Sequence, residues 1–81
     1  MEQHEIKQRV VDIIARLLEV ESTFLLPDTR LQEDISASSL DRVEILINLE
    51  REFNIFINDE EAEKLHTVGD IVNLVEKKLG K

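Results

Sequence analysis

The chain has 81 residues, enough for one small domain whose hydrophobic core must be thin. Its 10 basic and 18 acidic residues give a formal net charge of −8, which repels nucleic acids and anionic membrane surfaces. The chain has no cysteine, so disulfides, thiol nucleophiles and cysteine-ligated zinc sites are excluded. No apolar run approaches the roughly 20 residues of a membrane-spanning helix, and residues 1–10 contain no signal-peptide core. We therefore expect a cytoplasmic domain.

The first half of the chain predicts one helix followed by a long loop. Apolar residues at spacings of three and four predict an amphipathic helix over residues 3–19. The periodicity ends in residues 20–37, where Pro27-Asp28-Thr29 is typical of a turn because proline presets φ. A loop of this length in so small a domain is usually functional or locally held in place. We expect it to be held by its apolar side chains, Phe24, Leu25, Leu26, Leu31 and Ile35.

Three later helices are predicted by one kind of start signal. In each, an N-cap residue is followed three positions later by a carboxylate, the pattern of a capping box. The pairs are Ser38 with Asp41, Asn58 with Glu61, and Thr67 with Asp70. They predict helices over residues 39–53 (or from 38), 59–64 and 68–79. We predict an all-α fold, a small four-helix bundle of three main helices and one short helix with a long first loop, as a single domain over residues 1–81.

The helix predicted over residues 39–53 carries more apolar surface than a thin bundle can bury. Successive residues of an α-helix are about 100° apart around its axis. On this spacing the apolar residues form two stripes, a normal core face and a second stripe centred about 150° away. The core stripe is Ile45, Leu46, Leu49 and Phe53, and the second stripe is Leu40, Val43 and Ile47. Charged residues lie beside the second stripe, and residues 41–63 hold eight carboxylates against two arginines, a net charge of −6. This pattern predicts a docking surface for basic partners; the alternative is a helix buried on two sides, with carboxylates that keep the protein soluble.

A set of spaced motifs runs through most of the chain. Its first part is Pro27-Asp28-Thr29, Leu31, Glu33-Asp34 and Ser36-Ala37-Ser38-Ser39-Leu40-Asp41. Its later parts are Val43-Glu44, Leu49-Glu50, Glu52-Phe53, residues 58–65, Thr67-Val68-Gly69-Asp70 and Ile71-Val72. Together these motifs resemble the acyl carrier proteins of type II fatty-acid and polyketide synthesis, which are four-helix bundles with a long first loop.

The resemblance implies a carrier of acyl groups, held as thioesters on a covalent 4′-phosphopantetheine arm that comes from coenzyme A. In the family's Gly-Ala-Asp-Ser-Leu-Asp motif, the serine that bears the arm corresponds to Ser39. Ser36 stands where the family has glycine, and Ser38 stands where it has the aspartate that helps the phosphopantetheinyl transferase recognise its target. The implied partners are this transferase and acyl-transfer and chain-elongation enzymes with basic docking patches, bound by a monomer. The implied partner-binding residues are Leu40, Asp41, Val43, Glu44, Ile47 and Glu50.

The position of Ser39 is compatible with this role on physical grounds. A hydroxyl at a helix N-terminus is exposed, and a phosphodiester there meets free backbone N–H groups and the positive end of the helix dipole. Without the surrounding motifs, Ser38 or Ser39 would be read simply as an N-cap. Two further alternatives stay open. One is an unmodified carrier-like interaction module, suggested by Ser36 and Ser38, and the other is an aminoacyl or D-alanyl carrier.

We expect no catalytic site and no metal site in this chain. His4 and His66 lie far apart in sequence without metal-ligand spacing, and we expect both on the surface. The serines have no nucleophile-activating base nearby in sequence. The acidic residues lack the spacing of an EF-hand loop. The chain is therefore not expected to be an enzyme.

Overall fold

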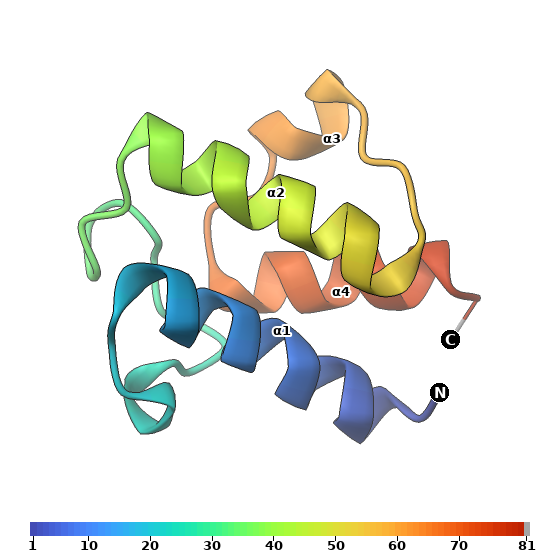
Figure 1. Cartoon of the computed structure of the whole chain (residues 1–81), viewed down its shortest axis with the longest axis horizontal. Coiled ribbons are helices and arrows are strands. Elements are labelled where there is room, and N and C mark those ends of the chain that lie inside the picture. The colour runs from blue at the N-terminus through green and yellow to red at the C-terminus, as the bar shows by residue number, and fades with distance from the viewer. Residues whose placement is uncertain (81) are drawn as a thin grey trace.

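The computed structural model describes residues 1–80 as a bundle of helices (Figure 1). The elements are α1 (Gln3–Leu18), η1 (Ser22–Phe24), α2 (Ser39–Phe53), α3 (Asp59–Glu63) and α4 (Val68–Lys78). The all-α bundle with three main helices and one short helix is confirmed, and each expected helix boundary agrees to within one residue. The 3-10 helix η1, a single turn in the first loop, is not predicted by the sequence pattern.

Capping boxes fix the starts of three helices, as the sequence predicts. Ser38 Oγ accepts the backbone N–H of Asp41 at 3.1 Å, and Asp41 Oδ2 accepts the backbone N–H of Ser38 at 2.9 Å. The same arrangement joins two further pairs, Asn58 with Glu61 and Thr67 with Asp70. Such caps stabilise a helix start by about 1 kcal/mol each. The first turn of α2 is therefore well defined.

The core lies between α1, α2 and α4, and α1 contacts both of the other helices (Figure 1). From α1 the buried side chains are Ile6, Val10, Val11, Ile13 and Ile14. From α2 and α4 they are Ile45, Leu49, Phe53, Val68, Ile71, Val72 and Val75. The short helix α3 contributes no buried residue. The bundle has overall extents of 30 × 26 × 19 Å, so its single core is thin.

The loop between α1 and α2 is fastened to the start of α4. The backbone N–H groups of Gly69 and Val68 donate to the carbonyl oxygens of Pro27 at 2.8 Å and Thr29 at 3.0 Å. A Cβ atom on Gly69 would lie only 2.8 Å from the Pro27 oxygen, so glycine is what allows this close approach. The long loop is thus held in place, as expected for an ordered loop of this length.

The expectation that five apolar side chains hold the loop is wrong for two of them. Leu25 and Leu31 are buried and Ile35 is half-buried, but Phe24 and Leu26 are exposed. The backbone of Leu25 is extended, with φ −92° and ψ 95°. Because neighbouring side chains point in opposite directions along extended backbone, burial of Leu25 turns the side chain of Leu26 outward. Phe24 ends the 3-10 helix η1, and its side chain also faces outward.

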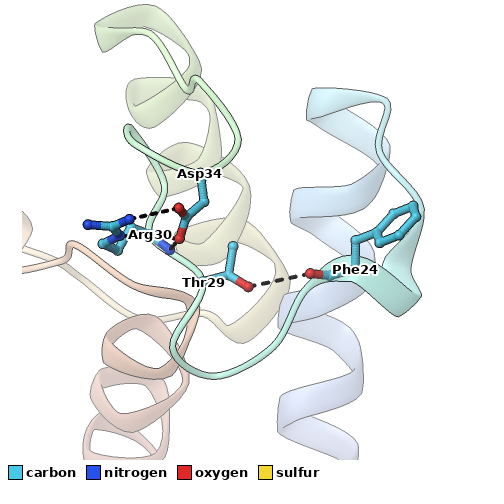
Figure 2. Close-up of polar contacts among 4 residues, drawn as sticks. All are labelled: Phe24, Thr29, Arg30 and Asp34. Atoms are coloured by element: carbon cyan, nitrogen blue, oxygen red, sulfur yellow. Dashed lines mark hydrogen bonds and ion pairs between the residues drawn. The ribbon is translucent and has the colours of Figure 1, made fainter.

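Polar bonds within the loop complete its structure (Figure 2). The Thr29 hydroxyl accepts the N–H of Leu26 at 2.9 Å and donates to the carbonyl oxygen of Phe24 at 3.4 Å. The backbone N–H of Arg30 donates to Asp34 Oδ2 at 2.8 Å, and its guanidinium contacts both carboxylate oxygens. The side-chain and backbone hydrogen bonds from Arg30 hold the pKa of Asp34 below its usual value.

Candidate functional site

Ser39 is the first residue of α2, and its side chain is exposed. The N-cap is the preceding Ser38, so capping does not occupy the hydroxyl of Ser39. That hydroxyl makes no hydrogen bond to any other residue in the described range, 1–80. At the first two helical positions, Ser39 and Leu40, the backbone N–H groups have no acceptor within the helix. A negatively charged group on this hydroxyl would therefore meet free donors and the positive end of the helix dipole.

A strained turn leads into this position. Ser36 has a φ of 56°, in the left-handed region that favours glycine. Ala37 is buried and donates its backbone N–H to the carbonyl oxygen of Leu31 at 2.9 Å. Ser38 then has the extended backbone of an N-cap. The turn gives a physical reason for a glycine at position 36, and Ser38 supplies the cap that an aspartate there would supply.

The outer face of α2 bears the uncovered apolar stripe that the sequence predicts. Leu40, Val43 and Ile47 are 67, 48 and 42% exposed, whereas Ile45 and Leu49 of the inner stripe are buried. Burial of α2 on two sides is excluded by these exposures. An exposed apolar strip with a charged rim is typical of a surface that binds a partner.

The three carboxylates expected on this docking face differ in their surroundings. They are Asp41, Glu44 and Glu50. Glu44 is exposed, and its side chain makes no hydrogen bond to another residue between 1 and 80, unlike the side chains of the other two. Asp41 is half-buried and holds the N–H of Ser38, as described above. Glu50 is half-buried, and its Oε2 accepts the backbone N–H of Ile57 at 2.9 Å. Glu50 therefore fastens α2 to the segment before α3 in addition to adding negative charge.

An open groove with a volume of about 360 Å³ runs between α2 and α3 and includes Ser39. Its other lining residues are Arg42, Val43, Leu46, Asp59, Ala62 and Glu63. The guanidinium of Arg42 joins the two walls, because its Nη2 donates to the carbonyl oxygen of Ala62 at 3.1 Å. Sequence reasoning missed this role of Arg42. The sequence does contain one indication of it. Arg42 follows Ser39 by three residues, and residues three apart lie next to each other on the same side of a helix.

Arg42 also borders a much smaller cavity of about 10 Å³ in the core. The remaining lining residues are Leu31, Ile45, Leu46, Leu65 and Ile71. A space of this size holds about one water molecule at most. In the described conformation, the core therefore has no room for a chain of several carbon atoms.

An ion pair joins α3, the outer wall of the groove, to α4. Lys78 Nζ lies 2.9 Å from Glu61 Oε2, and both side chains are about three-quarters buried. The hydrogen bond from Lys78 and the backbone N–H of Asn58 hold the pKa of Glu61 below its usual value. The pair therefore links α3 to the end of α4.

Neither a metal site nor a membrane span is found among the residues that the structure describes. No three His, Asp or Glu side chains in that range are grouped so that they could hold a metal ion. None of the described helices is both long enough and apolar enough to cross a membrane. His4 and His66 are both exposed, as expected from the sequence.

Comparison with known proteins gives one consistent result. The family model described as a phosphopantetheine attachment site matches residues 8–75. The chain is 46% identical over 80 residues to the acyl carrier protein of Prochlorococcus marinus (strain MIT 9515), covering 99% of this chain and 100% of that protein. It is 37% identical over 75 residues to the acyl carrier protein of Porphyromonas gingivalis, covering 93% and 96%. The solved structure of acyl carrier protein from Enterococcus faecalis matches with a TM-score of 0.83 at 32% identity, covering 96% and 99%.

The matched family model and the helical bundle define a phosphopantetheine-bearing carrier domain. Within that class, the chain belongs to the acyl carrier protein family. Its members are carriers rather than catalysts, so this chain carries acyl groups on phosphopantetheine and interacts with the enzymes of synthesis. The resemblance drawn from the spaced sequence motifs is confirmed.

Proposed function

We propose that the phosphopantetheine arm is attached to the hydroxyl of Ser39, from which the chain delivers acyl intermediates to enzymes of fatty-acid, polyketide or related synthesis. The observation that carries this proposal is the exposed, unbonded hydroxyl at the first residue of α2. The site fits the group, because an open groove begins at Ser39 and the first-turn N–H groups suit a phosphodiester. The uncovered apolar stripe begins at the next residue, Leu40.

The residues near Ser39 have separate parts in this role. Ser38 and Asp41 fix the first turn of α2, so the hydroxyl is presented from a rigid helix. The N–H groups of Ser39 and Leu40 stabilise negative charge at the attachment point. When bound, the arm supplies a terminal thiol that holds acyl groups as thioesters. No base lies within hydrogen-bond distance of the Ser39 hydroxyl between residues 1 and 80, which supports an attachment site rather than a catalytic nucleophile.

In this proposal, partner enzymes dock on the outer face of α2. Its apolar residues Leu40, Val43 and Ile47 supply the contact area, and the carboxylates around them supply negative potential. The segment 41–63, with its net charge of −6, attracts basic docking patches. Association with the transferase and with acyl-transfer and elongation enzymes should therefore be fast and should weaken as salt rises.

Intact-mass measurement after incubation with coenzyme A and a broad-specificity phosphopantetheinyl transferase tests the attachment. The wild-type protein is expected to gain the mass of one phosphopantetheine group, and Ser39→Ala is expected to gain none. Ser38→Ala is the matched control, because it removes the adjacent hydroxyl and weakens the α2 cap by about 1 kcal/mol but leaves Ser39 in place. A wild-type protein without added mass, or added mass that survives Ser39→Ala, contradicts the proposal.

The same measurement on protein from its native host separates the two remaining alternatives. An entirely unmodified protein would be an interaction module, and an amino acid recovered from the arm would identify an aminoacyl or D-alanyl carrier. Ser38 keeps the capping role at its position, so the first turn of α2 that bears Ser39 is formed without the aspartate. We expect modified protein loaded with acyl groups.

A further inference from the structure

The first loop presents a second apolar surface, separate from the stripe on α2. Phe24 and Leu26 are 70 and 57% exposed, on either side of the buried Leu25. With Val20 and Ile35 they line an open groove of about 680 Å³. Figure 2 shows the ring of Phe24 directed away from the polar contacts that close the loop. Two neighbouring large apolar side chains at this exposure are suited to filling a pocket on another protein.

This surface is presented by a fixed backbone. The Thr29 hydroxyl bonds the backbone of both Phe24 and Leu26, and the carbonyl oxygens of Pro27 and Thr29 are bonded to the start of α4. The exposure of the two side chains is therefore set by the folded loop and is not the result of a loose segment. Because the backbone is already ordered, docking through these side chains has a low entropic cost.

The charge around the groove indicates a basic partner. Residues 19–36 contain five carboxylates and one arginine, and that arginine is paired with Asp34 at 3.0 Å. A second copy of this chain, with its net charge of −8, would bring like charges together, and an anionic membrane would be repelled in the same way. A protein pocket that is apolar inside and basic at its rim complements the surface.

The residues that line this groove belong to the loop between α1 and α2. Figure 1 shows this loop at the same end of the bundle as the start of α2, opposite the N-terminus. Ser36 lines the groove, and it lies three positions before Ser39, so the chain limits their separation to about 11 Å. An enzyme that acts on the Ser39 hydroxyl must approach that atom directly. A standard interface covers about 800 Å² on each partner, a disc with a radius of roughly 16 Å, which includes this end of the groove.

We propose that the phosphopantetheinyl transferase docks on this loop groove as well as on α2, with Phe24 and Leu26 filling an apolar pocket that has a basic rim. This inference rests on the proposed function, because it requires that Ser39 be the residue modified. The transferase must reach the oxygen atom of Ser39 itself, so its contact area includes this end of the groove.

Steady-state kinetics with the transferase of the same host tests the inference. The double variant Phe24→Ser/Leu26→Ser is expected to raise the KM for the apo-protein tenfold or more and to leave kcat unchanged. The matched control is Phe56→Ser, which removes an equally exposed ring (71%) from the segment between α2 and α3 and is expected to change KM less than twofold. Thermal melts monitored by circular dichroism should show that both variants fold, since all three side chains are exposed.

The possible results separate this inference from the proposed function. A KM that is unchanged in the double variant, or raised equally by Phe56→Ser, overturns the inference while Ser39 modification stands. A wild-type dimer by light scattering that dissociates in the double variant also overturns it, because the groove would then bind a second copy. Binding of the wild type, but not the variant, to phosphatidylcholine vesicles overturns it in favour of a lipid surface. Failure of the wild-type protein to be modified overturns the proposed function and this inference with it.

Discussion

The helices α1 and α2 have nearly equal lengths, 16 and 15 residues, and pack against the same core, but their outer faces differ. The exposed side chains of α1 are polar, and they include Glu5, Lys7, Gln8, Asp12 and Arg16. The exposed side chains of α2 include Leu40, Val43 and Ile47. In α1, every exposed position is polar, so burial of one apolar stripe explains where all of its apolar residues lie. In α2, burial in the core explains only the apolar residues of the inner face. The difference teaches that the outer face of α2 carries apolar surface that the fold itself does not use, as the proposed docking role requires.

The largest expected effect compares an isoleucine from each helix. Ile14 of α1 is fully buried, so Ile14→Ala should lower the free energy of unfolding by about 2–5 kcal/mol. Ile47 of α2 is 42% exposed, so Ile47→Ala should cost less than about 1 kcal/mol. Urea unfolding of both variants measures the contrast. Equal losses would show that Ile47 supports the fold and would remove the distinction between the two faces.

The second prediction concerns function at the same position. Ile47→Ala should raise the KM for the transferase about tenfold, which corresponds to about 1.4 kcal/mol, because apolar contact area on the docking face is lost. Gln8→Ala truncates an exposed side chain on the outer face of α1 and serves as the control, with no expected change. Modification rates measured over a range of apo-protein concentrations give both values. An effect of Gln8→Ala as large as that of Ile47→Ala would contradict docking through the outer face of α2.

Most of the fold could be predicted from the sequence because its signals are local. The capping boxes lie within four consecutive residues, and the two stripes of α2 follow from helical phase alone. The exposure of Phe24 and Leu26 could not be predicted. It depends on how the loop is fastened to Gly69, which is distant in sequence. The bond from Arg42 to Ala62 is likewise a tertiary contact without a sequence pattern.

A third prediction concerns the strained backbone of the turn that precedes α2. Ser36 has a φ of 56°, a conformation that costs a residue with a Cβ about 1–2 kcal/mol. Ser36→Gly removes that strain, but glycine also gives the unfolded chain more conformational freedom, which opposes folding. A net stabilisation of about 0.5–1 kcal/mol is therefore expected. Ser22→Gly in η1, where φ is not positive, should instead destabilise the protein. Thermal melts distinguish the two outcomes, and a destabilised Ser36→Gly would contradict the strain argument.

A further effect of about the same size concerns the capping box of α4. Partial burial acts to raise the pKa of Asp70. The backbone N–H groups of His66 and Thr67, each 3.0 Å from Oδ2, have the larger combined effect and hold the pKa below its usual value. A lowered folded-state pKa stabilises the protein above about pH 4, and this contribution disappears as pH falls through the folded-state value.

Asp70→Asn should therefore lower stability by about 1 kcal/mol at pH 7, and the difference from wild type should close as pH falls through the folded-state pKa of Asp70. Glu60→Gln removes the same charge at an exposed position and should show a much smaller difference at pH 7. Urea unfolding across this pH range measures both variants. If Asp70→Asn is less stable than the wild type by the same amount at low pH, the carboxylate charge is not the cause of the lost stability.

The central claim concerns a single atom, the hydroxyl oxygen of Ser39. Tandem mass spectrometry of peptides from the modified protein locates the phosphopantetheine group directly. The account predicts that the group is found on Ser39 and on no other residue. Its location on Ser36, on Ser38 or on any other side chain would contradict the account.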